Sequence, residues 1–261
     1  MNETSTNQPS ESPLGPVATT SVCSRMFNVF AAPGDVFEEV RGSKPNTANW
    51  LVPILLSCLV AVFYVFVVFS QESVQHQMRE AREKQFQKQV EAGKMTQQQA
   101  DQVMEMSERF TGPAVVKILG SVSAVFANFA WLFFLALVIW LVGWKLFKGS
   151  FSYMQTVEVT ALAGMVSVLG AVVTMLLVVA TGSMHTTLGP ALLIREFNPA
   201  DKVHLALASV NLLTLWYIVV LALGLAKLSG ASFLKSFLWL LVPYVMLRAG
   251  LILSGLGQQG M

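Results

Sequence analysis

Residues 205–255 decide the fold. Two apolar runs, ALASVNLLTLWYIVVLALGLA (206–226) and FLWLLVPYVMLRAGLILSG (237–255), flank the basic, Gly/Ser-rich joint KLSGASFLKS (227–236). The joint is too short to fold alone, and each run is long enough to cross the roughly 30 Å of hydrocarbon in a bilayer. Because backbone polar groups in lipid must be paired internally, we expect the two runs to form a helical hairpin that crosses a membrane and returns.

The composition of the whole chain points to the same class. Of its 261 residues, 54% are hydrophobic and 12% are charged, which leaves too little polar surface for a soluble domain of this size. The 17 basic and 15 acidic side chains nearly cancel, so the sequence does not predict a basic surface that binds nucleic acid. Cys23 lies in a polar tail and Cys58 in an apolar run, so the two are not expected to form a disulfide.

Three further apolar runs precede the hairpin, so the predicted fold is all-α, a multi-pass bundle of five transmembrane helices. The predicted spans are residues 50–69, 115–147, 157–181, 204–226 and 233–254, within one membrane domain at 50–255. The second span is about 33 residues or roughly 50 Å long, so it must tilt or project beyond the bilayer. The third is rich in small residues that let helices approach closely, and Gly164 and Gly170 are expected on its contact surface.

The segment at 24–49 is predicted to be amphipathic and to lie next to the membrane. It follows a polar tail, residues 1–23, which is expected to be disordered; a second short tail is residues 256–261. Its apolar side chains fall at spacings of three and four, and Pro33 suits the first position of a helix. Such a segment either lies in the headgroup layer or packs on the spans of its own chain.

Residues 71–113 form the long polar connection between the first two spans. Its pattern predicts a helical hairpin outside the bilayer, in which Gly93 ends the first helix. Thr96 and Gln99 have the spacing of a capping box that starts the second helix. The charged residues of this hairpin form either a solvated face or a surface that binds a partner.

The sequence lacks the patterns of an enzyme or a metal site. The three histidines are far apart without Cys or carboxylate partners at ligand spacing, and no phosphate-binding loop ending in Lys-Ser or Lys-Thr occurs. Serines that follow glycine lack the nucleophile-elbow pattern. We therefore expect no catalytic residues, no cofactor and no metal.

Polar residues within or near the spans are the remaining candidates for a functional role, because charges in a membrane are costly. Glu158 is placed at the entrance of the third span, where water would reach it. Asn128 and Asn211 are expected to make hydrogen bonds between helices rather than bind a ligand. Tyr217, in the middle of the fourth span with Trp216, is interpreted as a packing residue.

Arg248 lies near the far end of the fifth span, about 20 Å beyond Lys235 at 1.5 Å per residue. With five spans, the loop at 182–202 lies on the same side of the membrane as the end of the fifth span. We therefore predict that Arg248 reaches outward and pairs with Glu196 or Asp201 of that loop, with contact to lipid headgroups as the alternative.

Several stretches, in this order, resemble the Yip1 family of five-span membrane proteins. They are FNVFAAPGDVFEEV (27–40), the run from Tyr153 into the small-residue span, and LALASVNLLTLWYIVVLALGLAKLSGASFLKSF (205–237). The resemblance covers about residues 26–254. It implies, for eukaryotic relatives, a role in vesicle traffic with binding of Rab-type GTPases and of other family members. This sequence does not contain the long N-terminal region or the Asp-Leu-Tyr-Gly-Pro motif of many such relatives. It looks more like prokaryotic members of the family. Rab binding is therefore not expected of this protein.

The resulting expectation is a non-enzymatic membrane scaffold or organiser that acts through partners. These partners are the lipid bilayer and other membrane proteins or a second copy of the chain, whereas a small-molecule substrate cannot be named. The alternative is a small transporter or the membrane subunit of one, which should bury a polar, water-accessible cavity near mid-membrane. A scaffold should bury small and apolar contacts instead.

The resemblance also implies a bacterial cytoplasmic membrane with a cytoplasmic N-terminus. The positive-inside rule favours the opposite orientation, because a cytoplasmic N-terminus would leave more basic residues outside than inside. Most of the outside ones belong to the polar hairpin, so the prediction follows the resemblance.

Overall fold

The structure is a computed structural model that describes residues 20–110, 112–194, 197–198 and 201–254. The predicted tail at 256–261 and most of the tail at 1–23 lie outside these residues. Helix α1 begins at Val22, where the Ser21 hydroxyl accepts a hydrogen bond from the Ser24 N–H, so the helical part starts slightly earlier than predicted.

The described residues form an all-α fold without strands, and five of their helices are long and apolar enough to cross a membrane. The spans are α3 (Ala48–Val68), α6 (Pro113–Leu141), α7 (Tyr153–Thr181), α9 (Leu212–Ser229) and α10 (Phe233–Leu253). A π-helical turn, Val142–Leu146, extends α6. The predicted class and the number of spans are therefore confirmed.

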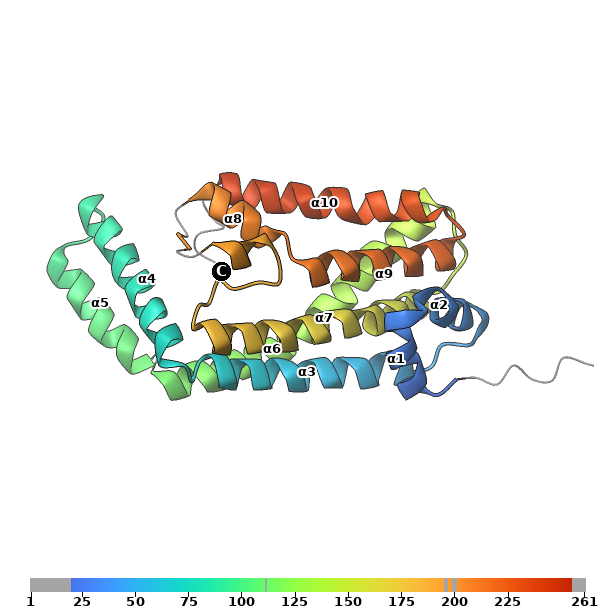
Figure 1. The fold of residues 1–261 in the computed structure, drawn as a ribbon, viewed down its shortest axis with the longest axis horizontal. Helices are drawn as coiled ribbons and strands as arrows, with labels where there is room; N and C mark the ends of the chain where they lie inside the picture. The colour runs from blue at the N-terminus through green and yellow to red at the C-terminus, as the bar shows by residue number, and fades with distance from the viewer. Residues whose placement is uncertain (1–19, 111, 195–196, 199–200, 255–261) are drawn as a thin grey trace, which may run out of the picture.

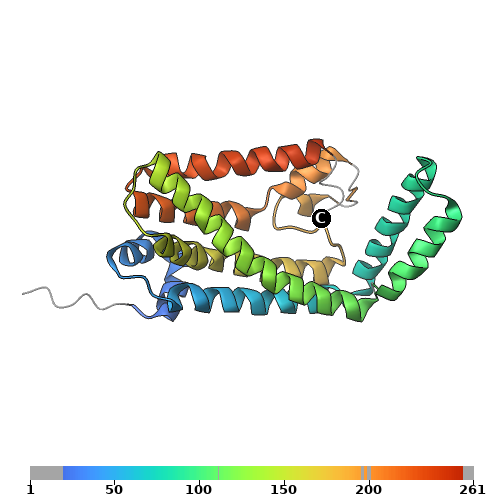
Figure 2. The ribbon, with the colours of Figure 1, turned by 180° about the vertical axis from the view of Figure 1, so that it is seen from behind.

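Four of the spans lie side by side in the order α3, α7, α9, α10, and α6 runs diagonally across them (Figures 1 and 2). The tilt expected of the longest span is visible in this crossing. The close neighbours of α6 are α3 and α7. A cavity lies beside α6, among α3, α7 and α9.

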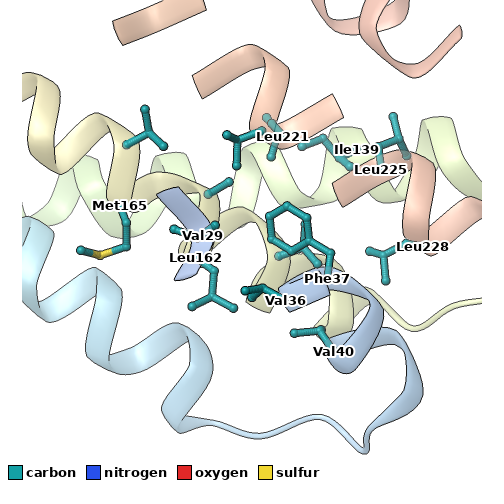
Figure 3. Close-up of a cluster of buried hydrophobic side chains, with 14 of the residues drawn as sticks. Val29, Val36, Phe37, Val40, Ile139, Leu162, Met165, Leu221, Leu225 and Leu228 are labelled. Atoms are coloured by element: carbon teal, nitrogen blue, oxygen red, sulfur yellow. The ribbon is translucent and has the colours of Figure 1, made fainter. Parts of the chain in front are cut away.

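Helices α1 (Val22–Ala31) and α2 (Pro33–Gly42) form a cap at one end of the bundle, where they pack on α7 and α9. Phe37 of α2 is fully buried between Leu162 of α7 and Leu225 of α9, within one apolar core (Figure 3). An ion pair of 3.0 Å between Lys227 Nζ and Glu38 Oε2 also joins α9 to α2. Of the two predicted placements, packing on the chain's own spans is the observed one.

Helices α4 (Glu72–Glu91) and α5 (Gln97–Phe110) form the predicted hairpin at the opposite end (Figure 1). Gly93 has a φ of 66°, and the capping box forms as expected. Thr96 Oγ1 accepts from the Gln99 N–H at 3.2 Å, and Gln99 Oε1 accepts from the Thr96 N–H at 2.9 Å. The hairpin is fastened at its base, where the Gln77 side chain donates to Gly182 O at 2.6 Å and accepts from the Met184 N–H at 3.1 Å.

The predicted fourth span, residues 204–226, begins too early. A separate helix α8 (Lys202–Ser209) precedes α9, and a 3-10 turn η2 (Pro190–Leu193) lies before α8. The helical conformation is interrupted just before α9, at Val210 and Asn211. The Oδ1 atom of Asn211 accepts hydrogen bonds from the backbone N–H groups of Leu213 and Thr214 and so caps α9. Asn211 therefore does not join two helices as predicted, because its short side chain satisfies the exposed donors of its own helix start.

Candidate functional site

Glu158 is the most deeply buried acidic side chain among the described residues, at 1% exposed. Its Oε1 accepts from the Asn46 N–H at 2.6 Å, and its Oε2 accepts from the Asn49 Nδ2–H at 2.7 Å. The expectation that water reaches Glu158 is wrong, because the connection from α2 to α3 folds over the start of α7. Two donors hold the two oxygens, so this arrangement clamps the connection to α7.

Arg25 forms a second buried charged contact in the cap. It is 4% exposed, and its Nε lies 3.1 Å from Glu39 Oε2, which joins α1 to α2. The Thr20 hydroxyl donates to the same carboxylate. The Arg25 guanidinium also interacts electrostatically with Glu158, so the two contacts act on one joint between the cap and the spans.

The close-approach surface differs from the predicted one. A Cβ added at Gly164 would meet no atom within 4 Å, and one at Gly170 would make an ordinary contact of 3.5 Å with Leu213. In contrast, a Cβ at Gly224 of α9 would overlap Val159 Cγ1 of α7. The prediction for Gly164 is therefore wrong, and Gly224 was missed although it is the single glycine of the apolar run at 206–226.

Arg248 does not form the predicted ion pair with Asp201. Its guanidinium lies 5.8 Å from the centre of the Tyr244 ring, and Asp201 Oδ1 accepts from the Val203 N–H at the start of α8. The other predicted partner, Glu196, lies outside the described residues. A neighbouring residue makes a comparable connection, because Tyr244 Oη donates to Ser209 O at 3.3 Å and joins α10 to α8.

The loop between α7 and α8 contains a cluster of aromatic rings. The His185 ring stacks on Phe197 at 4.7 Å between centres, and the His204 ring lies 5.8 Å from Phe197. His185 Nδ1 is buried without a hydrogen-bond partner among the described residues. Burial lowers the pKa of the His185 imidazole below its usual value of 6.5. Among the described residues, no group of three His, Cys, Asp or Glu side chains could hold a metal ion.

Acidification is expected to destabilise this loop through His185. Because the folded chain binds the proton less tightly than the unfolded chain, stability is full above about pH 6.5 and falls as the pH drops toward the folded-state pKa. We therefore expect the free energy of unfolding to be lower at pH 5.5 than at pH 7.5. In His185→Phe, which keeps the ring stack, this difference should shrink in denaturant titrations; in the exposed control His76→Phe it should not. An unchanged pH dependence in His185→Phe would contradict the assignment.

A cavity of about 170 Å³ lies among α3, α6, α7 and α9. Ser57 of α3 and Asn128 of α6 line it, and the Ser57 hydroxyl donates to Asn128 Oδ1 at 2.6 Å. This is a hydrogen bond between helices, as the sequence predicts for Asn128. Tyr217, interpreted from sequence as a packing residue, also lines the cavity.

A family model for the Yip1 domain matches residues 27–256. The chain belongs to the Yip1 domain family. No curated protein and no solved structure matches it. The Yip1 match begins within α1 and extends past α10, so the cap, the five spans and the α4–α5 hairpin are all parts of the Yip1 domain. As a member of this family, the chain is an integral, multi-pass membrane protein.

In this Yip1 domain, the buried or helix-capping polar side chains described above make structural contacts. Glu158 and Arg25 are engaged in structural contacts, and Asn211 and Asp201 cap helices. The cap joint and the cavity are polar features that the described helices enclose.

Proposed function

We propose that this Yip1 domain protein is a non-enzymatic membrane organiser that acts through partner proteins, and that it contacts them through the α4–α5 hairpin. The supporting observation is that the hairpin projects from the bundle and is fastened near the start of α4 (Figure 1). Val74 is fully buried there, whereas most of the following residues of α4 are exposed or half-buried. A segment that contributes little packing to the spans is available for contacts with other molecules.

Helix α5 offers the apolar contacts that a partner surface needs. Ala100 faces inward and is 3% exposed, but Val103 and Met106 are 41% and 60% exposed. Outside the bilayer, neighbouring exposed apolar side chains with a polar surround are typical of protein interaction sites.

The transporter alternative has less support. The cavity beside α6 is small, and most of its lining is apolar. Close helix contacts such as that of Gly224 with Val159 belong to the small and apolar packing expected of a scaffold.

Affinity capture from native membranes tests the hairpin as the partner surface. Wild-type protein is compared with Val103→Ser/Met106→Ser and with the control Glu83→Ser/Gln87→Ser, which changes exposed polar residues of α4. With the α5 variant, the captured amount of at least one membrane protein should fall about tenfold, which corresponds to about 1.4 kcal/mol of binding free energy. The control should capture the same protein in the wild-type amount. Identical sets of captured proteins from all three chains would contradict the proposal.

The proposal includes an orientation. The cap is cytoplasmic and the hairpin lies on the outer side of a bacterial cytoplasmic membrane. Family resemblance supports this orientation, while the basic residues of the hairpin oppose it under the positive-inside rule.

A further inference from the structure

The cavity beside α6 reaches the surface that faces lipid. Trp131 of α6 lines it and is 58% exposed, and Ser167 of α7 lines it and is also exposed. Pro53 of α3 and Thr160 of α7 belong to the first halves of their helices. Asn128 and Ser167 are at the middle of α6 and α7, so the cavity extends from the middle of the bundle toward the cap and is accessible from within the bilayer.

The cavity lining combines apolar walls with uncharged polar groups. Its polar side chains are Ser57, Asn128, Thr160, Ser167 and Tyr217, and no Asp, Glu, Lys, Arg or His is among the lining residues. A charged ligand would have no counterion there, and burial of an unpaired charge is costly. The chemistry of the site selects a neutral ligand.

Two of these polar groups are not used by the fold. The hydroxyl of Ser57 donates to Asn128, and that of Thr160 donates to Thr156 O at 2.7 Å. By contrast, neither Tyr217 Oη nor Ser167 Oγ makes a hydrogen bond to any described residue. Both hydroxyls can donate and accept, and in a site without bulk water they need a partner.

We propose that this cavity binds the hydroxyl end of an uncharged lipid that enters from the bilayer. Tyr217 and Ser167 provide hydrogen bonds to the lipid hydroxyl. The apolar walls, which include Ile54 and Leu132, surround the adjoining carbon chain. A cavity of about 170 Å³ is close to the roughly 150 Å³ of an engineered apolar cavity that binds benzene. It therefore accommodates the hydroxyl and a few adjoining carbons, and the rest of the lipid remains in the bilayer.

Photolabelling of the full chain in lipid vesicles with a diazirine-bearing octanol tests the site. We expect adducts on cavity residues such as Trp131 and Leu132, located by mass spectrometry of peptides. Unlabelled 1-octanol should suppress these adducts, and n-octane at the same membrane concentration should not, because it cannot form hydrogen bonds. Octyltrimethylammonium should also fail to compete, because its charge is unpaired in the cavity.

Variants separate specific binding from general exposure to lipid. Gly164→Phe places a ring where a Cβ meets open space, and labelling of the cavity should fall by about tenfold; its control, Gly250→Phe in α10, also has open space and should label like wild type. Tyr217→Phe keeps the ring and removes Oη, so labelling should fall by about fivefold, the effect of one neutral hydrogen bond. Competition by octane equal to that by octanol, or unchanged labelling of Tyr217→Phe, would overturn the proposal.

Discussion

Replacement of Glu158 by alanine is expected to lower the free energy of unfolding by about 3 kcal/mol. The substitution removes the acceptor of the Asn46 N–H and of the Asn49 amide, and Asn49 is 0% exposed. It also removes a negative charge near the buried Arg25. Two donors would then lose their acceptor in one step, so the joint between the cap and α7 should open. Unfolding of the detergent-solubilised protein, followed by helix content, measures this loss.

Two further variants define the origin of the effect. Glu158→Gln keeps one side-chain oxygen as an acceptor, so it should lose less stability than Glu158→Ala. Glu83→Ala removes an exposed carboxylate from α4 and should change stability by less than about 0.5 kcal/mol. If Glu158→Ala were as stable as Glu83→Ala, the buried joint would not contribute to the fold.

Replacement of Gly224 by leucine is expected to cost about 3 kcal/mol, at the upper end of the range for overpacking. Even a Cβ at this position would overlap Val159 Cγ1 and would lie 3.4 Å from the Phe37 ring. The three residues belong to α9, α7 and α2. A larger side chain on α9 would therefore push away both α7 and the cap helix α2. Thermal unfolding in detergent, with Gly250→Leu as the control in open space, measures the effect.

A double-mutant cycle identifies the contact that causes this loss. Gly224→Ala should be destabilising by itself, and Val159→Ala removes the atom with which the new methyl group overlaps. Since the two residues touch, the loss of unfolding free energy in the double variant should be smaller than the sum of the two single losses by at least about 0.5 kcal/mol. Strictly additive losses would place the strain elsewhere.

Features that depend on neighbouring residues were predictable from the sequence. The five spans follow from long apolar runs, and the Thr96–Gln99 capping box follows from a spacing of three residues. The same holds for the amphipathic pattern of α1 and α2, although it left their placement open. In each case the local pattern and the fold favour the same structure.

Features that depend on distant residues were not predictable in this way. Glu158 is covered by Asn46 and Asn49, which are 112 and 109 residues away in the chain, so its own neighbours give no sign of its burial. Gly224 is a contact surface only because Val159 and Phe37 are placed against it. The break at Asn211 had a local signal, a good N-cap residue within an apolar run, but the hydropathy of the run concealed it.

Labelling of single cysteines in intact cells tests most directly whether the cap and the hairpin lie on opposite faces of the membrane. The native Cys23 in α1 is exposed, and Cys58→Ser removes the buried second thiol. In that background, a membrane-impermeant reagent should label Gln85→Cys of α4 from outside. With Gln85 unchanged, Cys23 should react only after permeabilisation. Labelling of both positions from the same side would contradict the five-span arrangement and, with it, the proposed presentation of the hairpin to partners.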